Sequence, residues 1–235
     1  MDITENTLQS RQVEPRRLYQ QIADQVRTLI LRGDYPVGSR LPPERDLAQQ
    51  LGVSRPSLRE ALIALEIEGS VEIRMGSGVY ACSHALRRPG LAIAMGESPA
   101  ELMQARSAVE GAVICLACAN VTPEGLARVQ DTIDAMREDI EHGRDVLDHD
   151  REFHMCIAEL SGNSVLVSLV GTLFDERRSP LASYMRHRLE GQPTCYAALH
   201  EHEQILRCLS QRDPLASESA MRTHIRAAAD RWVIT

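Results

Sequence analysis

Apolar residues recur every three or four positions along most of this chain, which is the period of an α-helix that packs on one face. The first apolar stripe covers residues 18–30, and two shorter stripes cover residues 47–51 and 58–65. Polar stretches containing Gly, Pro and Ser separate these stripes. The pattern predicts three helices in the first third of the chain, with the first helix packed behind the other two.

The second and third of these helices are joined by the short segment Leu-Gly-Val-Ser. Gly52 suits the left-handed conformation that ends many helices, and Ser54 suits the capping position of the next helix. Pro56 falls in the first turn of that helix, where proline is tolerated. Two helices joined by so short a turn indicate a helix-turn-helix.

A β-hairpin pattern follows the third helix. We predict strands at Val71–Arg74 and Gly78–Ala81, joined by the turn Met75-Gly76-Ser77. A hairpin in this place adds a wing, so residues 16–82 are predicted to form a winged DNA-binding domain. The alternative, a helical hairpin inside some other core, leaves the arginines at the exposed start of the third helix unexplained.

The remaining chain is predicted to be helical after a break at residues 83–97, which we interpret as a linker. A short helix within Leu91–Met95 is compatible with the pattern. Beyond it, we expect helices near residues 99–119, 123–142, 145–161, 163–174, 178–190, 196–211 and 213–232. The predicted fold is therefore mainly α, with a winged helix-turn-helix followed by an all-α helical bundle over residues 98–235.

The formal net charge of −7 is unusual for a protein that binds nucleic acid. Residues 16–82 contain nine Arg and eight acidic residues, whereas residues 83–235 contain sixteen Arg and twenty-two acidic residues. The chain contains no lysine, so every side-chain cation other than histidine is a guanidinium. DNA affinity must therefore come from the local placement of arginines and from two copies of the domain.

Several classes of protein are disfavoured by composition. No apolar run approaches the length of a membrane span, and the polar start MDITENTLQS does not resemble a signal peptide. The six cysteines are scattered, which fits a reducing compartment better than a disulfide framework. We therefore expect a cytoplasmic protein with no membrane partner.

The start of the third helix carries the residues expected to meet DNA. Arg55 and Arg59 are four residues apart and share a face, with Ser57 close to it. The first residues of a recognition helix usually meet base edges or phosphates in the major groove. Arg45 is placed to hold a phosphate, and Gly76 at the wing tip allows close approach to DNA. The alternatives are a solvated charge for any single arginine and an ordinary hairpin turn for Gly76.

A candidate metal site lies in the second half of the chain. Asp150 and His154 are four residues apart on one helical face, while His202 and His224 lie on the last two predicted helices. One carboxylate and three imidazoles suit a divalent ion, with zinc expected first and nickel or manganese as alternatives. A helical bundle can bring such residues together. The alternative is that each histidine is an ordinary surface or core residue.

Arg106 and Glu110 are four residues apart on the first helix of the predicted bundle. One interpretation is a surface ion pair. The other is that Arg106 points into the bundle and meets an anionic ligand, because a guanidinium pairs well with a carboxylate.

The stretch LPPERDLAQQLGVSRPSLREALIALEIEG, followed by RMGSG, resembles the GntR family of bacterial transcription regulators. The resemblance covers residues 16–82. It implies that operator DNA is contacted by Arg45, Ser54, Arg55, Ser57, Arg59 and Gly76. Pro43 and Pro56 depart from the residues usual in the family, and Pro56 removes one hydroxyl contact.

The second half resembles the FCD ligand-binding domain of the FadR-type branch of that family. The matching segments are ELMQARSAVE, DREFH, SGNS, HEQIL and MRTHI, and together they cover about residues 98–230. The resemblance implies a metal held by Asp150, His154, His202 and His224, and a small carboxylate effector that completes the metal shell and meets Arg106. Further segments such as RRLYQQIA and ERRS look like the hexuronate-responsive members.

These observations lead us to expect a homodimeric repressor that binds double-stranded operator DNA and responds to a sugar acid. A rival from another class is a metal-dependent enzyme that acts on a sugar acid, although no general base stands out beside the expected metal. A purely architectural DNA-binding dimer is a third alternative, but it has no use for the Asp/His set.

Overall fold

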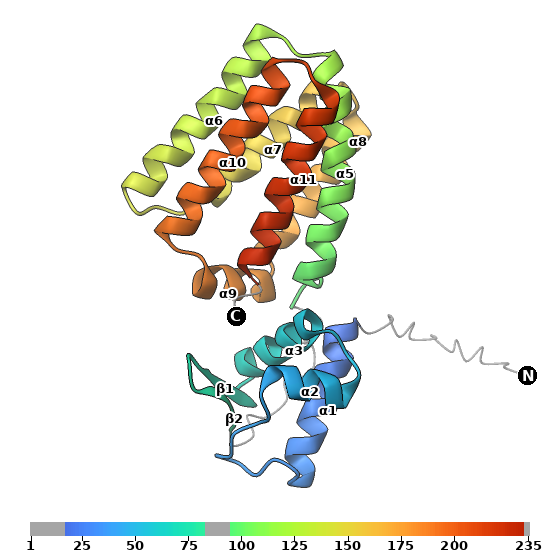
Figure 1. The fold of residues 1–235 in the computed structure, drawn as a ribbon, viewed down its shortest axis with the longest axis vertical. Coiled ribbons are helices and arrows are strands. Elements are labelled where there is room, and N and C mark those ends of the chain that lie inside the picture. Colours follow the sequence, from blue (N-terminus) through green and yellow to red (C-terminus); the bar gives the residue numbers. More distant parts are fainter. Residues whose placement is uncertain (1–16, 83–94, 233–235) are drawn as a thin grey trace, which may run out of the picture.

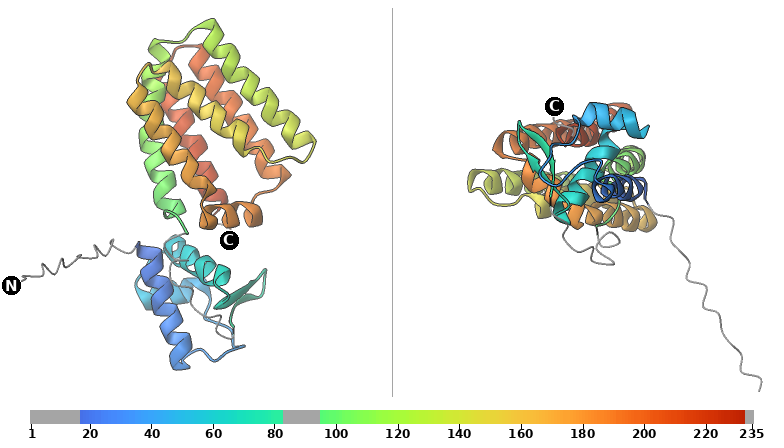
Figure 2. Two further views of the ribbon diagram at one scale, coloured as in Figure 1. Left: turned by 180° about the vertical axis from the view of Figure 1, so that it is seen from behind. Right: turned by 90° about the horizontal axis from the view of Figure 1, so that it is seen from below.

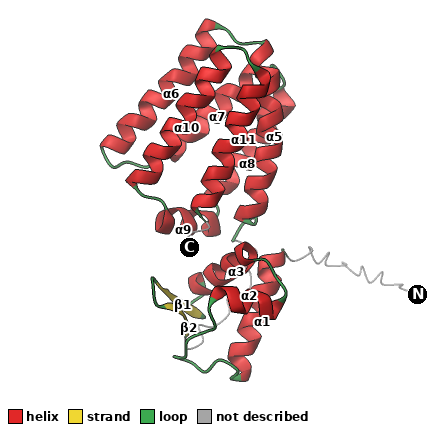
Figure 3. Ribbon diagram, viewed as in Figure 1, coloured by secondary structure: helices red, strands yellow, loops and turns green. Residues whose placement is uncertain are grey.

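The computed structural model describes residues 17–82 and 95–232, which form two units placed one above the other (Figure 1). Nearly all of the regular structure is helical, and the strands form one short hairpin (Figure 3). The linker expected at residues 83–97 and the helix compatible with Leu91–Met95 fall mainly on residues 83–94, which lie outside the described residues.

The smaller unit is a winged helix-turn-helix, as predicted. Its elements are α1 (Leu18–Arg32), α2 (Glu44–Leu51), α3 (Arg55–Ile67), β1 (Val71–Arg74) and β2 (Gly78–Ala81). The strands pair antiparallel, and Val71 lies opposite Ala81 in their register. Both strands have the predicted limits, because the turn between them is specified by local residues.

The turn of the helix-turn-helix follows from its capping residues. Gly52 has φ 67° and its N–H donates to Ala48 O, so α2 ends in the left-handed conformation expected for glycine. Ser54 Oγ accepts from the backbone N–H of Ser57 at 3.2 Å, which caps α3. α3 ends at Ile67, shortly before Gly69, which has φ 78° and leaves the helical conformation.

The core of this unit lies between α1 and α3. Ile22 and Val26 of α1 and Leu58, Leu62 and Leu65 of α3 are each no more than 1% exposed. Burying a side chain of this kind contributes about 1.5–3 kcal/mol relative to an exposed position. The apolar stripes seen in the sequence therefore meet one another and hold α3 on α1.

The larger unit is an all-α bundle. It consists of α5 (Pro99–Ala119), α6 (Pro123–Glu141), α7 (Leu147–Leu160), α8 (Ser164–Asp175), the 3₁₀ turn η1 (Glu176–Arg178), α9 (Pro180–Leu189), α10 (Gln192–Ser210) and α11 (Pro214–Arg231). The views from the front and from behind show α9 lying across the end of the bundle that faces the winged unit (Figures 1 and 2).

Some helix boundaries of the bundle differ from the sequence prediction. The helix expected near 178–190 begins at Pro180, because Ser179 caps α9 and the residues before it form η1. α10 begins at Gln192 instead of residue 196. Pro193 lies in the first turn of α10, where proline is tolerated.

Helix α5 requires a correction to the expected absence of membrane-length segments. Pro99–Ala119 has a mean hydropathy of 1.3 and is long and apolar enough to cross a membrane by length and composition. Half of this apolar stretch is buried inside the bundle, and α11 and α7 pack against the helix. Its apolar character therefore suits a helix that packs against α11, α7 and α8 within the bundle.

Candidate metal centre and DNA-binding surface

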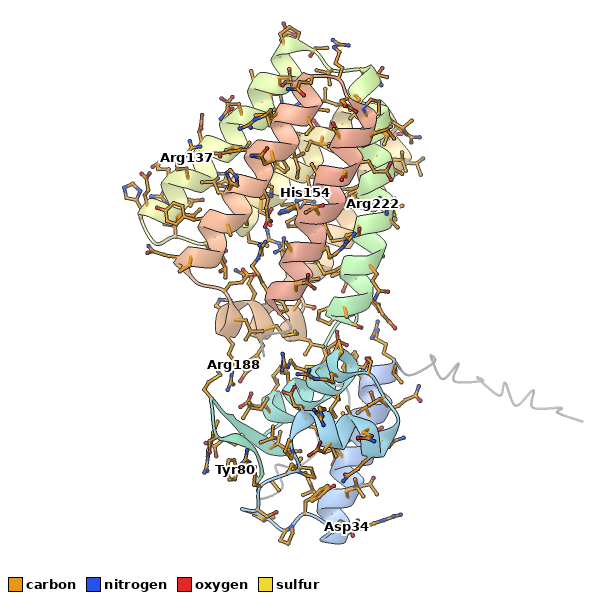
Figure 4. All side chains as sticks on the ribbon, in the orientation of Figure 1. Asp34, Tyr80, Arg137, His154, Arg188 and Arg222 are labelled. Carbon is orange, nitrogen blue, oxygen red and sulfur yellow. The ribbon has the colours of Figure 1, made fainter. Side chains whose placement is uncertain are left out.

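The structure brings the four expected metal ligands together inside the bundle. Asp150 and His154 come from α7, His202 from α10 and His224 from α11, and all four are buried. Their candidate ligand atoms lie within 4.8 Å of one another. Figure 4 shows His154 pointing into the bundle between its helices.

The distances between donors fit a single small ion. His202 Nε2 lies 3.1 Å from His224 Nε2 and 3.3 Å from Asp150 Oδ1. His154 Nε2 lies 3.5 Å from the same carboxylate oxygen. Ligands about 2.1 Å from one ion at tetrahedral or octahedral angles are separated by roughly 3.0–3.4 Å. The four donors therefore surround a volume of the right size for a divalent metal.

Two of these donor atoms are buried without a conventional partner. Asp150 Oδ1 and His154 Nε2 have no hydrogen-bond partner among the described residues. A buried polar atom that is left unpaired costs about 1–3 kcal/mol. A cation at this point would satisfy both atoms at once, so the donor set fits a metal ion.

Charged side chains behind the donors hold them in place. Glu110 Oε2 lies 2.5 Å from His154 Nδ1, and Glu201 Oε2 lies 2.8 Å from His224 Nδ1. Arg177 donates from Nη1 to Asp150 Oδ2, the carboxylate oxygen that does not face the imidazoles. Such partners orient a ligating histidine and direct its other nitrogen to the metal.

The electrostatics favour neutral imidazoles next to an ionised carboxylate. Burial lowers the pKa of His202, and burial together with the nearby His202 lowers the pKa of His224 to about 3. Burial alone would raise the pKa of Asp150, but Arg177 and the neighbouring imidazoles hold it well below its ordinary value. Burial likewise opposes charge on His154, and the Glu110 carboxylate raises its pKa overall. Neutral His202 and His224 and anionic Asp150 are the forms that bind a metal.

A small cavity of about 40 Å³ adjoins the donors Asp150, His202 and His224. Four guanidinium groups line it, and they belong to Arg106, Arg177, Arg186 and Arg231. Met136, Ile140 and Leu199 provide apolar walls. The combination of cations and apolar surface suits a small organic anion.

Arg106 points into the bundle and is 1% exposed, so its interpretation as a surface ion pair is wrong. Its Nε donates to Glu110 Oε1 at 2.7 Å, and its guanidinium lies 4.5 Å from the ring centroid of Phe174. Its Nη2 is buried and has no hydrogen-bond partner among the described residues. Arg106 therefore keeps one donor available at the cavity.

The sequence did not single out Arg177, Arg186, Arg231 or Glu201 as parts of this site. Glu201 precedes His202 in the chain, but its carboxylate contacts His224 and Arg231 on the next helix. Arg177 lies in η1, outside any helical repeat. The one available signal was the ERRS segment in the resemblance, which contains Arg177 without indicating its partner.

Two histidines that neighbour the candidate ligands in the sequence point elsewhere. His149 Nδ1 lies 2.6 Å from Asp139 Oδ2 on α6, and His200 is exposed beside Glu203. Cys118 is buried in α5, and all six cysteines are free.

Two of the expected DNA contacts are freely accessible. The side chain of Arg45 is 85% exposed at the start of α2, beside Asp46. Gly76 has φ 69° at the tip of the wing, next to the exposed Met75. A left-handed φ favours glycine, so the turn requires this residue whatever its role toward DNA.

The residues expected to contact DNA at the start of α3 differ in how exposed they are. Arg55 is exposed, while Ser54 and Ser57 share a 2.8 Å hydrogen bond between their hydroxyls. The side chain of Arg59 is only 17% exposed, because it donates from Nη2 to Glu44 Oε2 at 2.7 Å. Arg59 is thus more enclosed than its position beside Arg55 on the helix predicts.

Comparison with known proteins finds a matching family for each of the two units. Residues 18–81 match the bacterial regulatory proteins of the gntR family, and residues 101–227 match the FCD domain. The chain belongs to the GntR family of bacterial regulators. It is therefore a DNA-binding transcription regulator with a winged helix-turn-helix domain and an FCD domain.

Similar proteins cover almost the whole chain. The Exu regulon transcriptional regulator of Escherichia coli K12 is 35% identical over 219 residues, which cover 90% of this chain and 83% of the relative. The Uxu operon transcriptional regulator of the same strain is 32% identical over 222 residues, covering 92% and 86%. The solved structure of E. coli McbR/YncC covers 92% of this chain and 97% of its own with a TM-score of 0.53 at 20% identity, which supports the fold alone.

The family decides between two of the functional classes considered above. The GntR-family relatives are named as transcription regulators, so the metal-dependent enzyme is set aside.

Proposed function

We propose that this protein is a metal-containing, homodimeric repressor whose binding to operator DNA is controlled by a small carboxylate, with a sugar acid of the hexuronate class as the effector. The observation that supports it most directly is the buried Asp/His cluster beside an arginine-lined cavity, in the same chain as a winged helix-turn-helix. We place the DNA-binding domain at residues 16–82, the linker at 83–97 and the effector domain at 98–235.

The metal would be held by Asp150, His154, His202 and His224, with zinc favoured over nickel or manganese. A bound divalent ion supplies a Lewis-acidic centre for a carboxylate oxygen. The protein contributes the guanidinium of Arg106, which lies in the apolar surroundings of Phe174 and keeps Nη2 available. A charged hydrogen bond to a carboxylate is stronger in such an environment than in water.

Effector binding requires the cavity to expand. Its volume of about 40 Å³ holds only a few water molecules, since a single buried water needs roughly 10–15 Å³. Arg186 lines the cavity from α9 and donates to both oxygens of Asp145 at 2.9 Å. We infer that this pair separates when a sugar acid enters, and that its charged groups then meet the effector.

The effector class rests on the names of the relatives as well as on the site. Two relatives are named for the Exu regulon and the Uxu operon. We therefore propose D-galacturonate and D-glucuronate as the first effectors to test, and we place the protein in the cytoplasm, where it meets DNA.

We propose that the dimer forms through the outer faces of α5 and α8, which pack side by side (Figures 1 and 2). Leu116 of α5 is 48% exposed, and Val165 and Leu169 of α8 are 73% and 41% exposed. Exposed apolar patches of this kind mark interaction surfaces. A two-fold dimer would place the same patch on both subunits and present two recognition helices to an inverted repeat.

Thermal unfolding tests the effector site. The metal-loaded protein is heated with D-galacturonate, D-glucuronate and a series of other carboxylates, before and after chelation. A ligand that binds only the folded state raises the melting temperature by mass action. We expect a rise with at least one sugar acid that disappears after chelation. Unchanged melting temperatures with every acid, together with no effect of chelation, would remove the metal-and-carboxylate site from the account.

A further inference from the structure

The recognition helix α3 lies on the side of the winged unit that faces the effector domain (Figure 1). Arg55 and Arg59 of α3 line a groove of about 390 Å³, and its other walls include Met103 of α5, Arg222 of α11 and Trp232 just after α11. Two of the residues expected to contact DNA, Arg55 and Arg59, thus face the protein's own effector domain.

This arrangement excludes a DNA duplex from α3. Reading base edges requires the helix to enter a major groove about 12 Å wide, with phosphates on both sides. The groove beside Arg55 has the volume of a small ligand, and α5 and α9 both contact α3. The DNA-binding domain must therefore move away from the effector domain before α3 can enter DNA.

One cluster of contacts fastens the far end of α3 to α9. Glu66 Oε2 accepts from Tyr184 Oη at 2.8 Å and from Arg188 Nη1 at 2.7 Å. Arg188 Nη2 also donates to the backbone oxygen of Ile73 in the wing, at 2.5 Å. The other oxygen of Glu66 accepts from the N–H of Ile73 at 2.7 Å. Figure 4 shows Arg188 extending from α9 toward the winged unit.

Helix α9 also reaches the candidate effector site. Arg186, between Tyr184 and Arg188 in the sequence, lines the cavity and pairs with Asp145. η1 immediately precedes α9 and carries Arg177, which contacts the metal ligand Asp150. A shift of α9 that accompanies effector entry would therefore change the contacts that α9 makes with Glu66 and with the wing.

We propose that Tyr184, Arg188 and Glu66 form a clamp that holds the recognition helix in this closed arrangement, and that effector binding favours the clamped state through α9. The inference rests on the proposed effector-controlled repressor, and it adds the direction of control and the residues that transmit it. An effector shifts an equilibrium only by its difference in affinity for the two states, so it must bind the clamped state more tightly.

The test uses the full-length, metal-loaded dimer and an operator duplex selected from a random library by the same protein. Operator affinity is measured with and without the effector found by thermal unfolding. The variants are Tyr184→Phe, which removes one hydroxyl, and the double variant Tyr184→Phe/Arg188→Gln. The matched controls are Tyr196→Phe and Arg207→Gln on α10, where both side chains are exposed.

In the wild type we expect the effector to weaken operator binding at least tenfold, within the usual range of allosteric coupling. In the double variant we expect operator binding without effector to be as tight as in the wild type or tighter, and the effector to weaken it less than threefold. The melting-temperature rise with effector should remain, because these residues do not line the cavity. Hydrogen exchange of the β1 amides should be faster in the double variant.

Two results would overturn the clamp. One is an effector response in the double variant equal to that of the wild type. The other is weaker operator binding by the double variant without effector, since the clamp would then support DNA binding. A wild type that binds operator but ignores every acid instead contradicts the proposed function itself.

Discussion

Glu110 Oε2 lies 2.5 Å from Nδ1 of His154 in the interior of the effector domain. The other oxygen of the same carboxylate accepts from Arg106. Glu110 therefore links the proposed metal ligand His154 to Arg106, the residue proposed to bind the effector. It would hold both side chains in place without contacting either the metal or the effector.

We predict that Glu110→Gln weakens metal binding about 10–100-fold, the usual cost of removing such a partner. An amide oxygen orients His154 less firmly than a carboxylate does, and it leaves the buried Arg106 without its counter-charge. Competition with a coloured chelator measures the affinity. Glu218→Gln, which removes a half-exposed partner of Arg222 at the same i,i+4 spacing, is the control and should bind metal like the wild type. Equal affinities in Glu110→Gln and the wild type would contradict this role.

Arg45 and Arg55 should affect DNA binding in different ways. Arg45→Ala removes an exposed phosphate contact, so it should weaken binding to all sequences and reduce the slope of log affinity against log salt by about 1. Arg55→Ala should instead relax discrimination at one base position, at a cost of about 1–3 kcal/mol. Anisotropy titrations at several salt concentrations, with the selected operator and single-base variants, separate the two effects. The reverse pattern would exchange the two assignments.

The proposed dimer surface can be tested with one charge. Val165→Asp places a carboxylate within the patch formed by α5 and α8, where it would be desolvated on association. We expect the variant to be a monomer by light scattering at concentrations where the wild type is a dimer. Leu31→Asp is the control, since Leu31 is 59% exposed on α1 of the winged unit. A dimeric Val165→Asp variant would place the interface elsewhere.

The carboxylate of Glu60 makes the contact between the two units depend on pH. It accepts from Ser98 Oγ at 2.8 Å and from the N–H of Ala100 at 2.8 Å, at the start of α5. Burial raises the pKa of Glu60, and these hydrogen bonds offset only part of the rise. The folded state therefore holds this proton to a higher pH than the unfolded state.

The consequence is that the contribution of Glu60 to stability is present below its ordinary pKa and is lost as pH rises through the raised value. Urea unfolding between pH 4.5 and 7 should show a smaller loss of stability with rising pH in Glu60→Gln than in the wild type, because the amide has no proton to release. Glu141→Gln, which changes an exposed carboxylate, should follow the wild type. If the free energy of unfolding changes with pH equally in Glu60→Gln and in the wild type, this assignment is refuted.

Features with local causes were predictable from the sequence. The helix-turn-helix and the wing depend on Gly52, Ser54 and Gly76, each of which specifies the backbone of its own turn. The spacing of Asp150 and His154 placed them on one face of a helix, since one turn of helix separates them.

Features that depend on contacts between distant segments were not predictable in this way. Glu66 and Tyr184 are 118 residues apart, and no spacing in either segment indicates that they meet. Glu201 lies on α10, but its carboxylate contacts His224 on α11. The meeting of His202 and His224 with α7 was expected from the family resemblance, because spacing alone left it as one alternative among others.

The most direct test of the account is the affinity of the metal-loaded wild type for its selected operator, measured by anisotropy with and without saturating D-galacturonate or D-glucuronate. We expect at least one of these acids to weaken operator binding tenfold or more, and chelation of the metal to abolish the response. Tight operator binding that is unchanged by either acid, with metal bound, would contradict control by a hexuronate-type effector.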